Sequence, residues 1–524
     1  MVHRVLDRLD PFLPAFDTFV PQPGSSEEQQ RFAQLQTRLT RLVQEAFPNP
    51  HAPQTVVVIP SLSVDAEELA KIAGAHHYEE RLLCLLMLLR QPRTHVIYVT
   101  SQPIAPAIID YYLHLLPGIP LSHARRRLTL LSCHDSCSAS LTHKILARPR
   151  LIERIHAAIA DPEMAHMTCF NATPLERTLA VQLDIPLYAC DPALDQLGTK
   201  SGSRDVFRQA GVPMPDGFEQ LRDQQDIAQA LTALKLRQPA LRRAVIKLNE
   251  GFSGEGNALF SFAGAPADAN LEHWITQELP RRVRFEAPSE TWERYRHKFA
   301  QMGGIVECFV EGGEIRSPSV QCRIDPLGQT CIVSTHDQVL GGPSGQIFLG
   351  CAFPADRAYC REIQEAGGRV AAVLAQQGVI GRLGIDFISV KRAERREHYA
   401  IEINLRKGGT THPYLMLQYL TDGTYDAEQG LYHTPTGQPC YYYASDNLQS
   451  EAYKGLTPDD LIEIAVDHDL HFHGATQQGV VFHLIGALSE HGKLGTVCIG
   501  HSRGSAEALY RQTVAVLDQE TRRT

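Results

Sequence analysis

Cysteine pairs, long apolar runs and basic stripes are all missing from this 524-residue chain. Its twelve cysteines are too dilute for a disulfide scaffold, and no CxxC spacing suggests a zinc ribbon or a redox centre. A reducing, cytoplasmic location is therefore expected. The most apolar run, Leu82 to Leu89, is far shorter than the about 20 residues that cross a bilayer. The N-terminal residues also lack the apolar core of a secretion signal, so neither a membrane partner nor export is predicted.

The charge balance excludes a further class of protein. The 50 lysines and arginines are outnumbered by 59 acidic residues, which gives a net charge of -9. This charge repels a phosphate backbone, so no nucleic-acid partner is expected. No GxxxxGK[ST] sequence occurs, which argues against a P-loop nucleotide site. With 43% hydrophobic and 21% charged residues, the composition is that of a packed, enzyme-sized protein of about three or four domains.

The pattern of apolar residues divides the chain into four regions. An N-terminal extension, 1–50, contains an amphipathic helix at 25–47. From 51 to 195, short β-branched runs alternate with helical segments, which predicts a parallel sheet covered by helices. The third region, 196–430, holds a glycine-rich turn between two strands, then two helices and a strand-rich stretch. The last region, 431–524, has two strands with a helix on either side of them, which predicts a small α+β domain.

The most informative segment is a predicted β-hairpin formed by 381–388 and 399–406. Both halves alternate between apolar and polar residues, so one face of the hairpin collects Asp386, Glu402, Asn404 and Arg406. If the turn lies near 394, Asp386 faces Glu402 across the hairpin. Two carboxylates and an amide oxygen on one face favour Mg²⁺ or Mn²⁺ over zinc. An ordinary amphipathic hairpin with its polar face in water is the alternative.

Two upstream segments carry further polar groups at strand ends. The strand at 244–246 leads directly to Lys247 and to a glycine-rich turn at 251–256, whose amides could close over phosphates. A second strand carries Glu307 and meets a short hinge, with Glu314 seven residues after Glu307. Each motif alone is weak evidence, since solvated lysines and acids are common. Their order along the chain is what carries information.

This order, a lysine, a lysine with a glycine-rich loop, a hinge with spaced acids and a D…ExN hairpin, resembles the ATP-grasp superfamily over about 200–430. The resemblance implies an α/β protein in which two α+β subdomains grip ATP, with an N-terminal Rossmann-like domain and a small C-terminal α+β domain. It implies ATP and Mg²⁺ or Mn²⁺, with two ions, as cofactors. The metal ligands that it implies are Asp386, Glu402 and Asn404. The groups that it places beside the transferred phosphoryl group are Arg406, Lys247 and Arg382.

The same resemblance assigns the nucleotide contacts. Lys200 and Lys247 match the two lysines that bind nucleotide phosphates. The loop that closes over ATP would include Gly251, Ser253, Gly254 and Gly256. The adenine hinge would consist of Glu307 with the backbone of Cys308 and Val310, and the acceptor of the ribose hydroxyls would be Glu314.

Longer stretches resemble one branch of the superfamily, the peptide ligases related to the enzyme of pheganomycin biosynthesis. They are STHDQVLGGPSGQ at 334–346, EINLRKGGTTHP at 402–413 and YKGLTPDDL at 453–461. The branch implies an ADP-forming ligase that joins a small carboxylate, such as an amino acid, to an amine or a peptide N-terminus through an acyl phosphate. Candidate substrate contacts, each of which could equally be structural, are Arg316, Arg323, Asp337 and His412. The chain could also form a homo-oligomer.

Two other functions use the same scaffold. A phosphotransferase would lack an amine acceptor and leave a stable phosphorylated product, whereas a non-catalytic module would only bind ATP. The intact carboxylates of the hairpin argue against the module. A likeness of fold does not separate a ligase from a kinase.

Two other motifs suggest different functions, a hydrolase and a metal site, but neither is complete. Residues 500–504 match the G-x-S-x-G elbow of hydrolases. That fold needs a histidine after Ser502, and His501 is the last histidine in the chain. A histidine-rich segment contains His468, His471 and His473. Without a fourth ligand, such a segment is more often structural than metal-binding.

Overall fold

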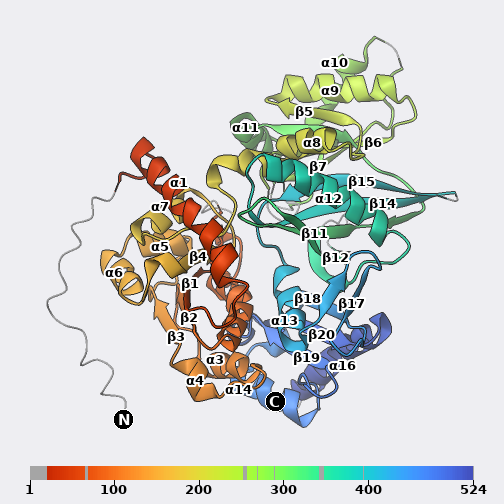
Figure 1. Ribbon diagram of the computed structural model, residues 1–524. Helices are drawn as coiled ribbons and strands as arrows, with labels where there is room; N and C mark the ends of the chain where they lie inside the picture. Colours follow the sequence, from red (N-terminus) through yellow and green to blue (C-terminus); the bar gives the residue numbers. More distant parts are fainter. Residues whose placement is uncertain are drawn as a thin grey trace.

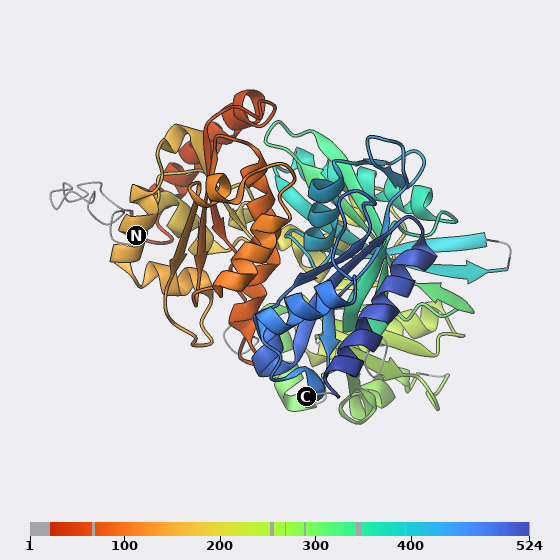
Figure 2. The ribbon, with the colours of Figure 1, turned by 90° about the horizontal axis from the view of Figure 1, so that it is seen from below.

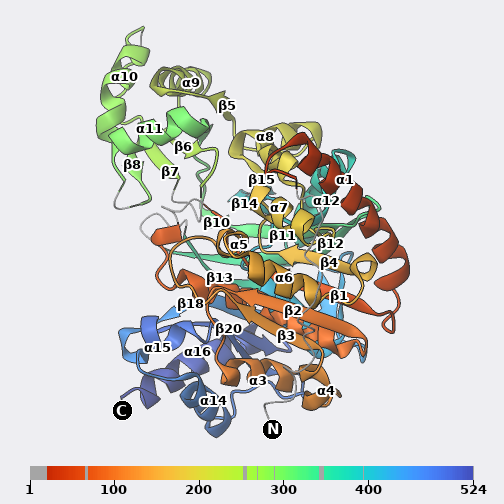
Figure 3. The ribbon, with the colours of Figure 1, turned by 90° about the vertical axis from the view of Figure 1, so that its left-hand side faces the viewer.

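The computed structural model describes residues 21–64, 69–251, 256–267, 269–287, 290–341, 347–393 and 395–522. These residues form three main β-sheets with helices packed on them (Figure 1). The N-terminal region forms a four-stranded sheet, the middle of the chain a five-stranded sheet, and most later strands a nine-stranded sheet. Figure 3 shows the lobe with the five-stranded sheet standing above the rest of the molecule.

The N-terminal sheet is parallel, as the alternation of strands and helices predicts. Its region contains α1 (Ser26–Arg41), η2 (Leu42–Ala46), β1 (Gln54–Ile59), η3 (Ala75–Arg90), β2 (Thr94–Thr100), α3 (Pro106–His114), α4 (Leu121–Arg125), β3 (Leu128–Ser132), α5 (Leu141–Leu146), α6 (Pro149–Ala157), η4 (Pro162–Met164), β4 (Ala165–Cys169), α7 (Pro174–Gln182) and η5 (Pro192–Gly198). The strand order is β3-β2-β1-β4. Val57 and Ile59 pack into one core and Val56 and Val58 into another, so β1 is buried on both faces.

Two predicted helices of this region take unexpected forms. The amphipathic helix at 25–47 is present, but its last turn, η2, is a π-helix. Ser25 caps it, as predicted, because its hydroxyl accepts a hydrogen bond from the backbone N–H of Glu28. The segment predicted as a helix around 79–90 is the 3₁₀ helix η3, which is buried along most of its length. A helix that packs on several sides cannot show the one-sided apolar stripe of a surface helix.

The five-stranded sheet is antiparallel, in the order β5-β9-β6-β7-β8. Its lobe contains β5 (Gly217–Leu221), α9 (Gln224–Arg237), β6 (Arg243–Leu248), β7 (Asn257–Ser261), α10 (Leu271–Arg282), β8 (Arg284–Phe285), α11 (Trp292–Met302) and β9 (Gly304–Cys308). Ile246, Phe260 and Phe299 are fully buried between this sheet and the helices. The central strand β6 ends beside the glycine-rich turn, so packing in this core fixes where Lys247 lies.

The nine-stranded sheet collects strands from the rest of the chain. Its region contains α8 (Lys200–Gln209), β10 (Glu314–Arg316), β11 (Pro318–Ile324), β12 (Thr330–Gly341), β13 (Ile347–Phe353), α12 (Cys360–Gln376), β14 (Gly381–Arg392), β15 (Arg395–Asn404), α13 (Thr411–Thr421), β16 (Thr424–Asp426), β17 (Leu431–His433), β18 (Tyr441–Gln449), η6 (Glu451–Tyr453), α14 (Pro458–Asp467), β19 (Gly479–His483), α15 (Ala487–His491), β20 (Lys493–Gly500) and α16 (Arg503–Glu520). The order is β10-β14-β11-β12-β13-β18-β20-β19, with β15 paired to β14. The helix α12 interrupts the stretch that the sequence predicts to be rich in strands.

The C-terminal region is joined to the rest of the fold in two ways. Strand β18 pairs with β13, so the predicted C-terminal region extends the large sheet. Its apolar residues also share one core with η3 and α3 of the N-terminal domain, including Leu86, Tyr112 and Val497. Figure 2 shows the C-terminal region, in blue, beside the N-terminal domain, in orange. Among the described helices, none has the length and apolar character needed to cross a membrane.

Candidate active site

A cavity of about 700 Å³ is lined by residues of the five-stranded and nine-stranded sheets and by η3 with neighbouring segments of the N-terminal region. The hinge wall belongs to the five-stranded lobe and its exit, and consists of Val245, Lys247, Glu307, Cys308, Phe309 and Val310. The acidic face belongs to the β14–β15 hairpin and its exit, and consists of Asp386, Glu402, Asn404 and Arg406. The basic wall comes from the N- and C-terminal regions, and consists of Lys71, Tyr78, Arg81, Asp446 and Lys493.

The hairpin has the predicted register. Asp386 lies opposite Glu402, and Asn404 lies opposite Gly384. The amide nitrogen of Asn404 donates to one oxygen of Asp386 at 3.1 Å, and that of Gln338 donates to the other at 2.7 Å. Because Asn404 uses its nitrogen for this bond, its amide oxygen is available as a ligand. The hairpin therefore presents oxygen donors of the kind that hard divalent cations prefer.

The electrostatics of the acidic face favour a bound cation. Burial, and then the charge of Glu402, raise the pKa of Asp386 to about 7. Burial also acts to raise the pKa of Glu402, but the Lys200 ammonium, 2.6 Å away, outweighs it and holds this pKa below its ordinary value. Burial lowers the pKa of Arg406. Two carboxylates thus compete for limited positive charge, a cost that a divalent cation would remove.

The two predicted lysines lie on different elements, and Lys247 lines the cavity while Lys200 pairs with Glu402 of the acidic face. Lys200 begins α8, and its backbone N–H donates to the carbonyl of Asn249 beyond the end of β6. The Asn249 side chain also accepts from the backbone and hydroxyl of Ser201, which locks α8 to the lobe. Lys247 lies at the end of β6, with its ammonium 2.5 Å from Glu307. Both lysines are buried, so each has lost solvation that an anionic ligand could restore.

In the hinge wall, the Glu307 side chain and the backbone N–H of Cys308 already have partners within the protein. Glu307 pairs with Lys247 and, at 3.2 Å, with Arg204. The backbone N–H of Cys308 donates to the carbonyl of Asp216, so its carbonyl is the group left to face a ligand. Val310 lines the cavity beyond it. In the predicted phosphate loop, Gly251 and Gly256 approach closely, and Ser253 and Gly254 lie outside the described residues.

Strand alternation directs three predicted contacts away from the cavity. Ile315 and Ser317 line it, so Glu314 and Arg316, one residue out of phase, face the other way. Glu314 pairs there with Arg396 on the hairpin at 2.5 Å. Asp337 likewise faces away: it accepts a hydrogen bond from the Tyr359 hydroxyl at 2.6 Å and pairs with Arg503 at 2.7 Å. Glu314, Arg316 and Asp337 therefore lie apart from the described residues that line the cavity.

Three further expected contacts also lie outside the cavity wall. Arg323 and Arg382 face each other across β11 and β14, and neither is among the described residues that line the cavity. His412 is buried behind the basic wall, with Nδ1 3.0 Å from the carbonyl of Arg81 and its ring 4.3 Å from that of His483. Burial lowers its pKa to about 4, so it is a neutral packing group.

Sequence comparison identifies the family of this chain. A family model of the ATP-grasp domain of IQCH-like proteins matches residues 192–284 and 271–428, and a model of the PGM1 C-terminal domain matches 460–513. The chain is 31% identical over 474 residues to L-propargylglycine–L-glutamate ligase from Streptantibioticus cattleyicolor, which covers 88% of this chain and 94% of that enzyme. The chain belongs to the ATP-grasp carboxylate–amine ligases. It is an ATP-dependent enzyme that forms carbon–nitrogen bonds, as the resemblance implies.

Other relatives confirm the fold of this ligase. IQ motif-containing protein H from Danio rerio is 24% identical over 439 residues, which cover 74% of this chain and 41% of that protein. The biotin carboxylase of Campylobacter jejuni, solved with an ATP analogue, superposes with a TM-score of 0.51 at 14% identity, covering 87% of this chain and 90% of that one. The ADP complex of N5-carboxyaminoimidazole ribonucleotide synthetase has a TM-score of 0.50 at 12% identity, covering 90% and 98%. The ATP-grasp fold with a Rossmann-like N-terminal domain is therefore confirmed.

The basic wall and Gln338 of the ligase are not predicted from its sequence. Arg81 pairs with Asp446 at 2.5 Å and lies 4.1 Å from the centre of the Tyr78 ring, while Lys493 donates to the Tyr78 hydroxyl at 2.6 Å. These residues carry no local motif, because they come from separate parts of the chain. The sequence could have indicated Gln338, because it lies in the stretch 334–346 that resembles the peptide ligases. Its neighbour Asp337 was predicted as the substrate contact in its place.

Ser502 is a helix cap in the ligase, and replacing it should not affect catalysis. Its hydroxyl accepts from the backbone N–H of Ser505 at the start of α16. Ser502→Ala should leave kcat and KM unchanged in an ADP-release assay and lower the free energy of unfolding by about 1 kcal/mol. Thr457→Ala, which removes the equivalent cap of α14, is the matched control. A folded Ser502 variant with strongly reduced turnover would reopen the hydrolase interpretation.

Proposed function

We propose that this ligase joins the carboxylate of one amino acid, or of a related small molecule, to the amino group of a second amino acid or peptide. The observation that carries this proposal is the single cavity shared by the hinge wall, the acidic face and the basic wall. A nucleotide held by the first two would direct its terminal phosphate toward a substrate held by the third. The ligase from Streptantibioticus cattleyicolor, named for the joining of L-propargylglycine to L-glutamate, supports amino acids as the substrate class.

The proposed reaction has two steps. A carboxylate oxygen of the first substrate attacks the γ-phosphorus of ATP, and the bond to the bridging oxygen breaks to release ADP. The amine then attacks the acyl carbon, and phosphate leaves with the electrons of the carbon–oxygen bond. Phosphorylation is needed because a free carboxylate offers no adequate leaving group. The products are an amide, ADP and phosphate.

The acidic face fits Mg²⁺ or Mn²⁺, in the two-ion form typical of this family. Its donors are all oxygens, from Asp386, Glu402 and Asn404, and burial together with the neighbouring Glu402 charge raises the pKa of Asp386. Bound there, the metal would offset the charge of the nucleotide phosphates. Gln338 would orient Asp386, since its amide donates to that carboxylate at 2.7 Å.

Three cationic side chains of the protein would bind the phosphates of ATP. Lys200 at the start of α8 pairs with Glu402, Lys247 of β6 lines the cavity, and Arg406 belongs to the acidic face itself. Their charges would stabilise the negative charge on the moving phosphoryl group. At the hinge wall, the carbonyl of Cys308 and the backbone of Val310 would contact the adenine edge. Each group lies on a strand or at a helix start, which holds it in place before the substrate binds.

The proposed chemistry can be tested with isotopes. The ligase is incubated with ATP, Mg²⁺ and a library of amino acids and peptides, and the condensed product is identified by mass spectrometry. When the donor carboxylate carries ¹⁸O, one labelled oxygen should appear in phosphate for each amide formed. Label in AMP would show an acyl adenylate and exclude the acyl phosphate. A stable product heavier by one phosphate, without an amide, would show a phosphotransferase instead.

We also propose that the enzyme works in a reducing, cytoplasmic compartment. All twelve of its cysteines are unpaired, and most of them are buried. Free thiols in this number are typical of proteins from reducing compartments.

A further inference from the structure

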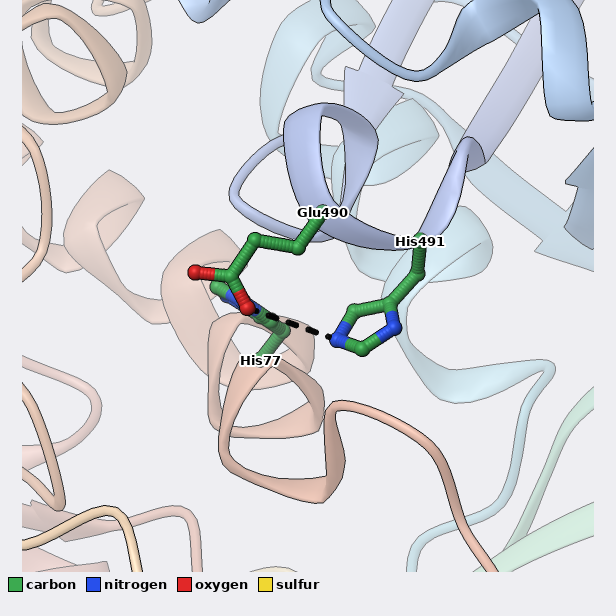
Figure 4. A group of neighbouring side chains, drawn as sticks. All are labelled: His77, Glu490 and His491. Atoms are coloured by element: carbon green, nitrogen blue, oxygen red, sulfur yellow. Dashed lines mark ion pairs between the residues drawn. The ribbon is translucent and has the colours of Figure 1, made fainter.

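A second group of ligand-type side chains lies outside the acidic face. His77 comes from η3, and Glu490 and His491 end α15, so the group joins the N- and C-terminal regions (Figure 4). One ligand atom from each of the three lies within 4.8 Å of the other two. Glu490 Oε2 is 3.6 Å from His491 Nε2. In a tetrahedral zinc site the ligand atoms are about 3.3–3.5 Å apart, so small side-chain rotations would bring this group to that spacing.

The surroundings of His77 suit a metal ligand. Its Nδ1 is 3.6 Å from the carboxylate of Glu80, and Glu80 is held by the backbone N–H of Gly486 at 3.0 Å. A carboxylate on this side favours the proton on Nδ1 and leaves the lone pair on Nε2. Nε2 of His77 is buried and has no hydrogen-bond partner among the described residues. A buried lone pair without a donor is costly, and a metal ion would satisfy it.

The backbone at Gly74 lets the two rings meet. This residue has φ of +65°, and a Cβ placed on it would lie 2.6 Å from His491 Nε2 and 3.2 Å from His77 Cδ2. Any side chain here would therefore push both rings away from the common point. Glycine removes this obstruction and also accepts the left-handed backbone conformation.

We propose that His77, Glu490 and His491 bind one Zn²⁺ ion that links η3 to the end of α15. Two imidazoles and one carboxylate are donors that zinc accepts, whereas the all-oxygen acidic face suits Mg²⁺. Three protein ligands leave one position for water or for a substrate group. His491 also lines the active-site cavity, two residues before Lys493 of the basic wall. The ion therefore braces the wall of the cavity that is remote from the hinge.

The proposal is tested by titrating the full-length, chelator-treated chain with Zn²⁺ in excess Mg²⁺, which occupies the acidic face. Competition with a zinc-binding dye should show one tight site per chain. His77→Ala and His491→Ala should each weaken it at least about 100-fold. His468→Ala, in the other histidine-rich segment, is the matched control and should keep the wild-type affinity. Tight binding that survives in His77→Ala, or disappears only in His468→Ala, would overturn the assignment.

Two further measurements distinguish the loss of a zinc ligand from misfolding of a variant. Glu490 is exposed, so Glu490→Gln should fold normally and still weaken zinc binding. Co²⁺ in place of Zn²⁺ should give intense visible bands of a tetrahedral site in the wild type and lose them in the His491 variant. A wild-type chain with no tight Zn²⁺ equivalent and no such Co²⁺ bands would refute the proposal outright.

Discussion

Glu402→Gln should lower kcat at least about 100-fold while the protein stays folded. The amide keeps the size of the side chain but removes the charge that faces Asp386 across the hairpin and pairs with Lys200 at 2.6 Å. The acidic face then has one fewer anionic ligand, and Lys200 loses its counter-ion. Asn404→Ala should have the same direction of effect, because it removes both a ligand oxygen and a hydrogen-bond donor to Asp386. ADP release at saturating ATP measures the loss.

The control for this experiment lies on the same strand. Glu397 pairs with Arg392 near the tip of the hairpin and does not line the cavity in the described structure. Glu397→Gln should therefore keep wild-type turnover. Raising the Mg²⁺ concentration should partly restore Asn404→Ala, which keeps both carboxylates, more than Glu402→Gln. Unchanged kcat in both Glu402→Gln and Asn404→Ala would exclude the acidic face as the metal site.

Lys247→Met should weaken the binding of a non-hydrolysable ATP analogue by about 10- to 100-fold, as measured by isothermal titration calorimetry. The lysine is buried at the end of β6, where its ammonium would compensate phosphate charge. It also pairs with Glu307 at 2.5 Å, so the variant leaves a buried carboxylate with Arg204 as its remaining cation. Some loss of stability is therefore expected together with the loss of affinity.

A double variant separates these two effects. Lys247→Met with Glu307→Gln removes both charges of the pair, so it should recover part of the stability lost in the single variant. It should not recover the affinity for the ATP analogue if Lys247 binds phosphate directly. Wild-type affinity in the folded double variant would remove Lys247 from the nucleotide site. Thermal melts of both variants provide the stability scale.

Much of the acidic face could be derived from the sequence. Alternation of apolar and polar residues was sufficient to predict the hairpin and its two acids. Their pairing also needs a β-bulge between Asp386 and Phe387, because the register set at the turn would place Asp386 opposite Ile401. The same local logic predicted the strands of the N-terminal sheet and the strand that ends at Lys247. It did not reveal α12, whose apolar residues lie within a stretch dominated by strands, or the 3₁₀ form of η3. Burial on several sides hides the local period of η3. The helix α12 does carry a helical spacing of buried residues, at Ile363, Val370 and Leu374, which the interpretation of this stretch as strand-rich passes over.

The faces of single strands were decided only by tertiary structure. Glu314, Arg316 and Asp337 have suitable chemistry, but packing of the large sheet turns their neighbours Ile315, Ser317 and Gln338 to the cavity. The basic wall shows the same limit more strongly, because Tyr78 and Lys493 are 415 residues apart and meet only when the N- and C-terminal regions share a core. The sequence by itself determined the family, from the order of its motifs, and the hairpin, from the alternation within its two strands. Which face meets the cavity, and which distant cations complete it, depends on long-range packing that no local pattern encodes.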